Sequence, residues 1–210
     1  MIRLKTRYRL VSSLMRNADI TIEKILQQSG VLFNTQGYKA TSISDITTLT
    51  GLTKGAIYRH FKSKEDLELR TLRHLATVMD EKVRFLIKEQ TTAGKKLRAV
   101  FNFFSSYITD PPIEGGCPLL NVAIEADDTN PGLRMGALAI LHNLRSSLVS
   151  ILEKGVKYGQ LKPDIDKKAF ATVCIASLEG AIMMSKLNGD NEDVRTIIRH
   201  LEGLVKEMEL

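Results

Sequence analysis

The 210-residue sequence contains no tryptophan, only 5 prolines and only 2 cysteines, Cys117 and Cys174. Two cysteines provide no disulfide framework, and they favour a reducing compartment such as the cytoplasm. No apolar run approaches the roughly 20 residues of a membrane-spanning helix. The basic N-terminus also lacks the apolar stretch and cleavage site of a signal peptide. These absences favour a soluble globular protein with no membrane partner.

The sequence patterns of common enzymes are also missing. No glycine-rich phosphate loop or dinucleotide-binding pattern occurs. The histidines are scattered without metal-ligand spacing: His60, His74, His142 and His200. An acidic cluster at residues 125–128 is interpreted as plain surface. The sequence therefore predicts no enzyme, no cofactor and no metal site.

Positive charge is present, and it is distributed unevenly. The net charge is +6, yet residues 1–65 carry 11 Lys and Arg against 4 Asp and Glu, whereas residues 66–210 carry 19 against 20. An excess of positive charge in the first third predicts a polyanionic partner for that part, in the first place nucleic acid. An anionic membrane surface and a merely solvated basic surface are the alternatives.

Helical periodicity dominates the chain, so the predicted fold class is all-α. The apolar pattern over residues 22–33 predicts a helix that Gly37 ends. Ser42 and Ser63 are candidate N-caps, and each has an aspartate three residues later. Further helices are predicted at residues 93–109, 117–126, 131–158, 169–184 and 194–208.

Residues 43–50, a turn containing Gly51 and residues 54–60 have the size and spacing of a helix-turn-helix. Ile57 and Phe61 are expected to hold the second helix down. The remaining residues of that helix should face outward or sideways: Lys54, Gly55, Ala56, Tyr58, Arg59 and His60. Glycine in a helix costs roughly 1 kcal/mol relative to alanine, and close approach of a DNA phosphate to the helix start explains Gly55. A packing contact with the preceding helix is the alternative.

The stretch "FNTQGYKATSISDITTLTGLTKGAIYRHFKSKEDL", residues 33–67, resembles the TetR (tetracycline-repressor) family of transcriptional regulators. The resemblance implies a three-helix DNA-binding domain joined to a helical ligand-binding and dimerisation domain. Members usually repress transcription and release operator DNA when a small-molecule inducer binds. The chain is accordingly divided into a basic extension (1–18), a DNA-binding domain (19–65) and a larger domain (66–210).

The resemblance also implies DNA contacts, mainly to phosphates, at matching positions: Thr41, Thr53, Lys54, Gly55, Tyr58, His60 and Lys64. Ala56 and Arg59 fall on the variable face of the recognition helix. The planar guanidinium of Arg59 suits the O6 and N7 atoms of guanine, with a phosphate contact as the alternative. Residues 1–14 precede Met15, and they are interpreted as either an upstream start or a basic arm that enters a minor groove.

The segment 169–184 carries one charged residue, Glu179, and is apolar nearly all round. Burial on both sides requires a second partner, which a homodimer supplies. The central helix of a monomeric bundle is the alternative. The predicted dimer contacts are Ala176, Ser177, Gly180, Ala181, Met184, Ile198 and Leu201.

The class of inducer is left open by the sequence. Candidate ligand-lining residues, each of which could equally be core, are Phe101, Phe104, Tyr107, Cys117, Met135, His142 and Asn143. An alternative function is a dimeric helical ligand-binding protein whose helix-turn-helix does not bind DNA.

Cys117, in "GGCPLLN", is expected at a helix N-cap. There the helix dipole would lower the pKa of its thiol and raise its reactivity. The resemblance adds that some family members sense electrophiles or oxidants through cysteine. An unreactive capping residue is the alternative. Cys174 lies mid-helix, in apolar surroundings that should raise the pKa of its thiol.

Overall fold

Helices form almost all of the regular structure. The structure is a computed structural model that describes residues 2–126, 128 and 130–210, with side chains from residue 18 onward. Within these residues the chain forms no strand, which confirms the all-α prediction. The helices are α1 (Ile2–Gln36), α2 (Ile43–Thr50), α3 (Lys54–Tyr58), α4 (Lys64–Lys88), α5 (Ala93–Phe104), α6 (Pro118–Ala126), α7 (Pro131–Lys157), α8 (Lys167–Asn188) and α9 (Glu192–Met208).

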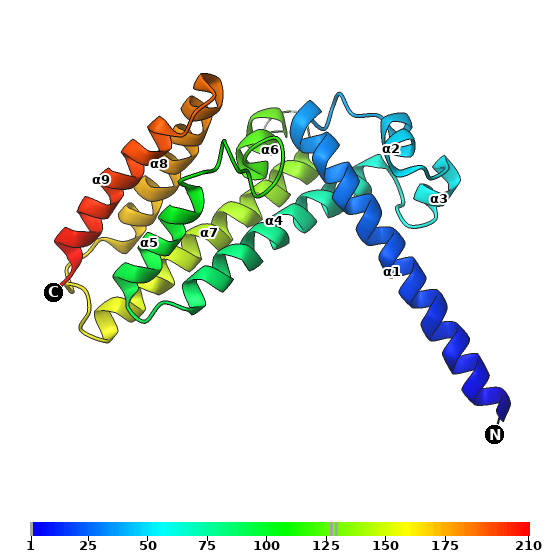
Figure 1. The fold of residues 1–210 in the computed structure, drawn as a ribbon, viewed down its shortest axis with the longest axis horizontal. Helices are drawn as coiled ribbons and strands as arrows, with labels where there is room; N and C mark the ends of the chain where they lie inside the picture. The colour runs from blue at the N-terminus through cyan, green and yellow to red at the C-terminus, as the bar shows by residue number, and fades with distance from the viewer. Residues whose placement is uncertain (1, 127, 129) are drawn as a thin grey trace.

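The first core lies where α1, α2 and α3 pack around the start of α4, at one end of the molecule (Figure 1). Its buried side chains include Phe33, Ile46, Ile57 and Leu67. The second half of α6 and the start of α7 also contribute, for example through Val122. The small DNA-binding region is therefore packed directly against helices of the larger one.

The second core lies among α5, α7, α8 and α9, at the opposite end (Figure 1). Leu97, Leu152, Cys174 and Leu201 are buried in it. Helix α4 joins the two cores, because Leu67 near its start belongs to the first and Met79 further along packs against the second. The domain boundary proposed between residues 65 and 66 thus falls at the start of a helix that both cores share.

The largest differences from the predicted helix boundaries are those of α1 and α5. Helix α1 begins at Ile2, so the backbone of the predicted N-terminal extension continues the first helix. The side chains of the basic arm lie outside the described residues. Helix α5 ends at Phe104 instead of residue 109, because the Ser105 N–H bonds back to the Asn102 carbonyl in the tighter three-residue pattern.

Contrary to the expectation from the sequence, α7 and α8 are each long and apolar enough to cross a membrane by length and composition. Core helices of soluble proteins pass the same test. Both helices contribute to the second core, α7 with Leu148 and Leu152 and α8 with Phe170 and Leu178.

Candidate functional site

Local side-chain caps set the geometry of the helix-turn-helix. The Ser42 hydroxyl accepts from the Asp45 N–H while the Asp45 carboxylate accepts from the Ser42 N–H, which confirms the predicted capping box. Gly51 ends α2 in the left-handed conformation with φ 69°, where glycine has no steric penalty. The Thr53 hydroxyl then accepts from the Ala56 N–H and begins α3. The turn is therefore encoded locally.

Helix α3 is held down by its apolar side, as predicted. Ile57 and Phe61 are buried, with 0% and 1% of their surfaces exposed. The Arg70 guanidinium lies over the Phe61 ring, 4.4 Å from its centroid, and donates to the His60 carbonyl at 2.9 Å. These contacts fix the end of a helix that is too short to be stable alone.

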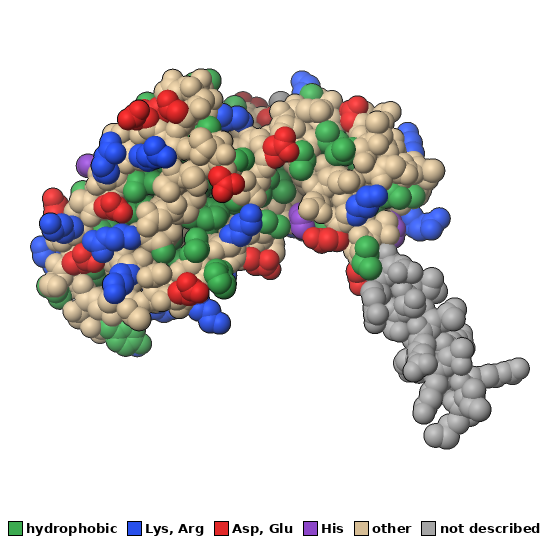
Figure 2. Space-filling model, viewed as in Figure 1, with side chains coloured by type: hydrophobic (Ala, Val, Ile, Leu, Met, Phe, Trp, Pro, Cys, Tyr) green, Lys and Arg blue, Asp and Glu red, His purple; other side chains and the backbone are tan. Residues whose placement is uncertain are grey.

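The outward side of α3 carries polar side chains. Lys54 and Arg59 are exposed, and so is Tyr58 at 39%, whose ring lies 5.9 Å from the Lys54 ammonium. Ala56 and His60 are half-buried at its border. In Figure 2, Lys and Arg side chains project from the end of the molecule where α2 and α3 lie. This face offers positive charge and hydrogen-bond donors to a phosphate backbone.

Gly55 has no packing role within the chain. A Cβ at this position would meet no atom within 4 Å, so the alternative of a packing contact with α2 is not supported. The absence of a side chain leaves the backbone of α3 open to close approach from outside. We therefore keep Gly55 in the proposed DNA-contacting surface.

The residues predicted to line a ligand site fall into three groups. Phe101 is fully buried in the second core. Phe104, Tyr107 and Cys117 lie together beside α8, where they contribute to that core. The other three lie on the exposed side of α7, so we correct their assignment: Met135, His142 and Asn143. The periodicity of α7 could not show which side faces the neighbouring helices.

Cys117 differs from the reactive thiol expected at a helix start. Its side chain is buried and its thiol donates to the Glu179 carboxylate, with 3.1 Å between sulfur and oxygen. Burial, and next the negative charge of Glu179, raise the pKa of the Cys117 thiol well above its ordinary value. The prediction of a lowered pKa is therefore wrong. Burial raises the pKa of Cys174 to about 12, as its apolar surroundings predicted.

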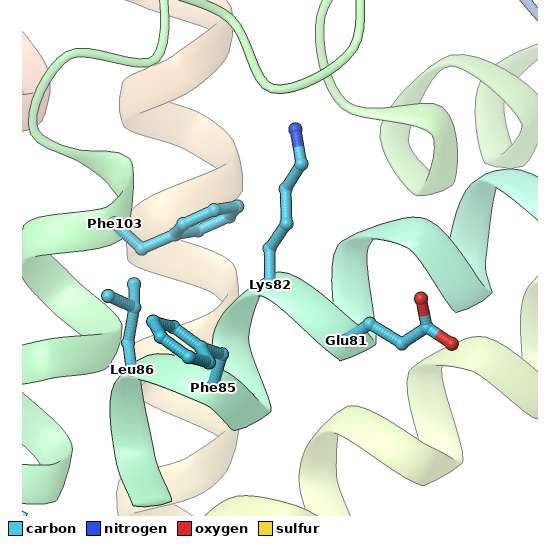
Figure 3. Close-up of a pocket in the computed structure, with 5 residues that line it drawn as sticks. All are labelled: Glu81, Lys82, Phe85, Leu86 and Phe103. Carbon is cyan, nitrogen blue, oxygen red and sulfur yellow. The ribbon is translucent and has the colours of Figure 1, made fainter. Parts of the chain in front are cut away.

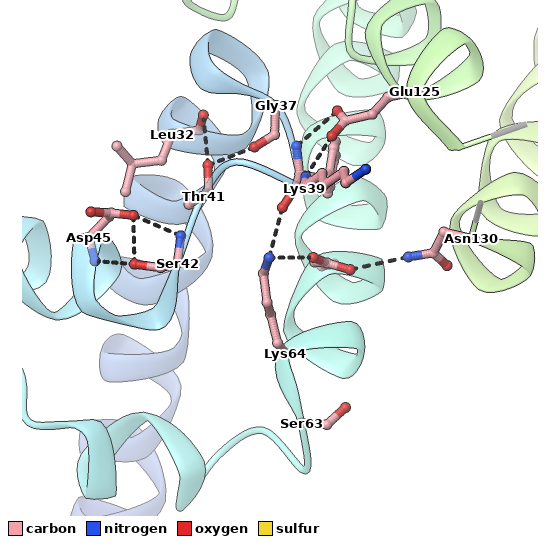
Figure 4. Close-up of polar contacts among 12 residues, drawn as sticks. Leu32, Gly37, Lys39, Thr41, Ser42, Asp45, Ser63, Lys64, Glu125 and Asn130 are labelled. Atoms are coloured by element: carbon pink, nitrogen blue, oxygen red, sulfur yellow. Dashed lines mark hydrogen bonds and ion pairs between the residues drawn. The ribbon is translucent and has the colours of Figure 1, made fainter.

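A cluster of polar contacts joins the end of α1 to α4, α6 and α7 (Figure 4). The Glu125 carboxylate of α6 accepts from the backbone N–H groups of Tyr38 and Lys39. The Glu68 carboxylate accepts from Asn130, the residue that caps α7. Glu125 therefore has a structural role that its interpretation as plain surface missed, because no local pattern indicates a contact 87 residues away.

Two predicted DNA contacts belong to this interior cluster and need correction (Figure 4). The Thr41 side chain is fully buried, and its hydroxyl donates to the Gly37 carbonyl at 2.7 Å. The Lys64 ammonium donates to the Tyr38 carbonyl at 2.9 Å and pairs with Glu68 at 3.3 Å. The buried Thr41 side chain cannot face DNA. The Lys64 side chain is 28% exposed, but its ammonium is engaged within the fold, so we correct this assignment as well.

A second set of amide contacts lies close to this cluster. The Asn34 amide donates to the carbonyls of Glu114 and Gly116, and the Asn121 amide donates back to Asn34. Helix α6 therefore touches α1 through Asn121, while Cys117 just before it is bonded to Glu179 of α8. No local pattern in the sequence indicates these long-range contacts.

The predicted dimer residues divide between surface and core. Ala176 and Met184 are exposed on α8, and Ser177 and Gly180 are half-buried beside them. Ala181, Ile198 and Leu201 are at most 6% exposed, so we correct their assignment as partner contacts. The apolar stripe of α9 is used within the chain, because α9 packs on α8 and α5. The helix expected to be buried on both sides has one buried side and one open apolar side.

Comparison with known proteins agrees with this architecture. Residues 25–70 match the profile of the bacterial regulatory proteins of the tetR family, and residues 93–201 match that of the tetracyclin repressor-like C-terminal domain. A TetR transcriptional regulator from Chloroflexus aurantiacus J-10-FL is 35% identical, with a TM-score of 0.88 over 92% of this chain and 98% of that one. A TetR-family regulator from Cytophaga hutchinsonii is 30% identical, with a TM-score of 0.85 over 92% and 97%.

A curated relative agrees as well. The HTH-type transcriptional repressor DhaR of Mycobacterium sp. (strain GP1) is 23% identical over 171 residues, which cover 81% of this chain and 84% of that protein. The C-terminal profile alone covers just over half of the chain, and the N-terminal profile covers the helix-turn-helix. The chain therefore belongs to the TetR family and is a DNA-binding transcriptional regulator.

Proposed function

We propose that the protein is a repressor that binds a pseudo-palindromic operator as a homodimer and releases it when a small molecule binds the larger domain. The observation that carries the proposal is the outward face of α3. Its exposed side chains make few contacts with the rest of the chain, and its glycine leaves the backbone accessible. The protein acts in the cytoplasm by binding, without catalysis.

The DNA-contacting surface comprises Thr53, Lys54, Gly55, Ala56, Tyr58, Arg59 and His60. Lys54 supplies charge for a phosphate, and Tyr58 and His60 supply hydrogen bonds. The Thr53 hydroxyl already caps α3, so this residue acts chiefly by placing the helix. Arg59 is the residue proposed to contact a base edge, because its guanidinium donates two parallel hydrogen bonds.

The proposed dimer interface is the open side of α8. Its exposed residues follow helical spacing and are largely apolar: Thr172, Val173, Ala176, Met183, Met184 and Leu187. Gly180 lies among them, and a Cβ at this position would meet no atom of its own chain within 4 Å. Two copies paired through this side would bury the apolar stripe and hold two recognition helices in a fixed relation.

The test is a gel-shift titration with the DNA upstream of the protein's own gene, repeated at several salt concentrations. We expect a saturable complex whose affinity falls steeply as salt increases. Arg59→Ala should relax the preference at one base pair of each half-site by about 10-fold, while the remaining preferences stay in place. A protein that shifts no upstream DNA at low salt would instead support the ligand-binding alternative.

A further inference from the structure

A half-buried acidic side chain beside the second core is left partly without a partner. Glu179 is the only charged residue between Ala169 and Met184 of α8. Its Oε1 atom accepts from the Cys117 thiol at 3.1 Å. Its Oε2 atom is buried and has no hydrogen-bond partner among the described residues. Burying a carboxyl oxygen without a partner costs free energy, so its presence in an otherwise apolar segment needs a reason.

A second unsatisfied group lies next to the first. The Tyr107 side chain is 0% exposed, and its hydroxyl has no hydrogen-bond partner in the described part of the chain. Burial chiefly, and next the neighbouring Cys117 and Glu179 side chains, raise the pKa of this hydroxyl. Such a group of buried, incompletely satisfied polar atoms in a core is expected at a binding site.

A series of neighbouring aromatic rings extends from Tyr107 to a groove on the surface. The ring of Tyr107 lies 5.4 Å from that of Phe104 and 6.4 Å from that of Phe103. Phe103 also lines an open groove of about 480 Å³ between α4 and α5, together with Glu81, Lys82, Phe85 and Leu86 (Figure 3). In Figure 3, Phe85, Leu86 and Phe103 converge, while Glu81 points away from them.

We propose that the effector is an aromatic or arylalkyl amine, which enters at this groove and places its ammonium group against the Glu179 carboxylate and the Tyr107 hydroxyl. The inference rests on the proposed function, since it names the ligand class that the larger domain would bind. The groove residues meet the apolar part of the ligand, and the rings of Phe104 and Tyr107 flank its charged end.

The charge of the ligand follows from what surrounds Glu179. No lysine, arginine or histidine pairs with its carboxylate among the described residues. Burial raises the pKa of Glu179, which disfavours its ionised form in the free protein, so a bound cation would be needed to stabilise the carboxylate. An ammonium group supplies both that charge and a donor for Oε2, and it is attracted to aromatic ring faces. A carboxylate ligand would be repelled.

The test compares three probes with the same apolar part: 4-phenylbutylamine, 4-phenylbutan-1-ol and 4-phenylbutanoate. Calorimetric titration of the full-length protein without DNA at pH 7 should give the highest affinity for the amine, about 10-fold or more above the alcohol. The acid should bind no better than the alcohol. If the amine does not bind, or does not bind most tightly, the proposal is overturned.

Two variants sharpen the result. Glu179→Gln keeps the shape of the side chain and should abolish the preference for the amine over the alcohol. Tyr107→Phe should weaken amine binding several-fold. Both should fold with unchanged or higher thermal stability, because each removes a buried group that lacks its partner. Glu153→Gln is the matched control on an exposed site of α7 and should behave as wild type. A Glu179→Gln protein that still prefers the amine overturns the proposal.

A gel shift with the same probes separates this inference from the proposed function. If the amine binds preferentially in calorimetry but leaves the operator complex intact, the amine-binding site is supported. The proposal that amines release the operator is then wrong. If the operator complex is released by compounds without any preference for a cation, the proposed function stands and the amine site is wrong.

Discussion

The outward faces of α3 and α8 lie at opposite ends of the molecule (Figure 1), and they share one feature. Each contains a glycine, Gly55 in α3 and Gly180 in α8, at which an added Cβ would meet no atom of the chain within 4 Å. Neither glycine is needed for packing within the protomer. The fold of a single chain therefore does not explain why either position is occupied by glycine.

The chemistry of the two faces differs. Around Gly55 the exposed side chains are those of Lys54, Tyr58 and Arg59, whereas around Gly180 they include Met184 and Leu187, which are 47% and 81% exposed. Polar and basic groups suit a phosphate backbone, and an exposed apolar stripe suits a protein surface of the same kind. We infer that another molecule approaches closely at Gly55 and at Gly180, and the neighbouring side chains indicate what kind of molecule each face meets.

The largest expected effect comes from breaking the α8 face. Gly180→Arg adds a bulky charged group that the isolated chain has room for, so the protomer should fold normally. Dimers should be lost in sedimentation velocity, and operator affinity should fall about 100-fold or more because a single half-site holds few contacts. Thr77→Arg on the exposed surface of α4 is the matched control and should leave both unchanged. If the Gly180→Arg protein remains dimeric, the dimer interface does not include this face of α8.

The corresponding change on the α3 face is smaller and separates folding from binding. Gly55→Ala meets no steric obstacle, and alanine favours a helix by roughly 1 kcal/mol over glycine. Thermal stability should therefore stay the same or rise, while operator affinity falls about 10-fold because the added methyl group keeps the DNA backbone away. Stability is measured by thermal denaturation and affinity by gel shift. Unchanged affinity would show that DNA does not approach this glycine.

Features encoded within a few residues could be predicted from the sequence. The Ser42 and Ser63 caps, the turn at Gly51 and the buried Ile57 all appear as expected. Each depends on neighbours one helical turn away, so a single sequence contains the necessary information. The helix-turn-helix is the part of the molecule in which such local signals are most frequent.

Features that depend on distant residues could not be predicted. The family resemblance predicts a phosphate contact for Lys64, but its ammonium is bound by the Tyr38 carbonyl, 26 residues away. The position of Cys117 before a helix predicts an activated thiol, but Glu179, which is 62 positions further along the chain, lies beside it. The apolar periodicity of α9 identifies Ile198 and Leu201 as buried, yet it cannot show whether they face the same chain or a partner.

A pair of lysines tests the distinction between the surface and the interior of the DNA-binding region. Lys54→Ala should weaken binding to all sequences several-fold and reduce the salt dependence by about one counterion for each phosphate that is no longer bound. Lys64→Ala should instead lower the free energy of unfolding by about 1–3 kcal/mol, because its removal takes the ammonium donor from the Tyr38 carbonyl and leaves the Glu68 carboxylate with Asn130 alone.

Salt-dependent gel shifts and urea denaturation of both proteins decide between the two roles. Lys54→Ala should leave the urea midpoint unchanged. If Lys64→Ala has wild-type stability but its DNA affinity depends less on salt, Lys64 contacts a phosphate. Its side chain then takes a different position on DNA from the one in this structure.

The smallest expected effect on operator binding concerns Cys117, for which none is expected. Thiolate is the reactive form of cysteine, and each unit by which the pKa of a thiol is raised reduces its thiolate fraction at neutral pH about tenfold. Because burial and Glu179 raise the pKa of Cys117, alkylation by iodoacetamide at pH 7–8 should be much slower than for an exposed free thiol, and faster only as pH increases well above that range. Cys174 should be equally slow, and both should react at the ordinary rate in urea.

Mass spectrometry gives the two rates, and a gel shift after quinone treatment should show the operator complex unchanged. Rapid native modification of Cys117, with dissociation of the complex in wild type but not in Cys117→Ser, would restore the role of a reactive sensor that its buried position argues against.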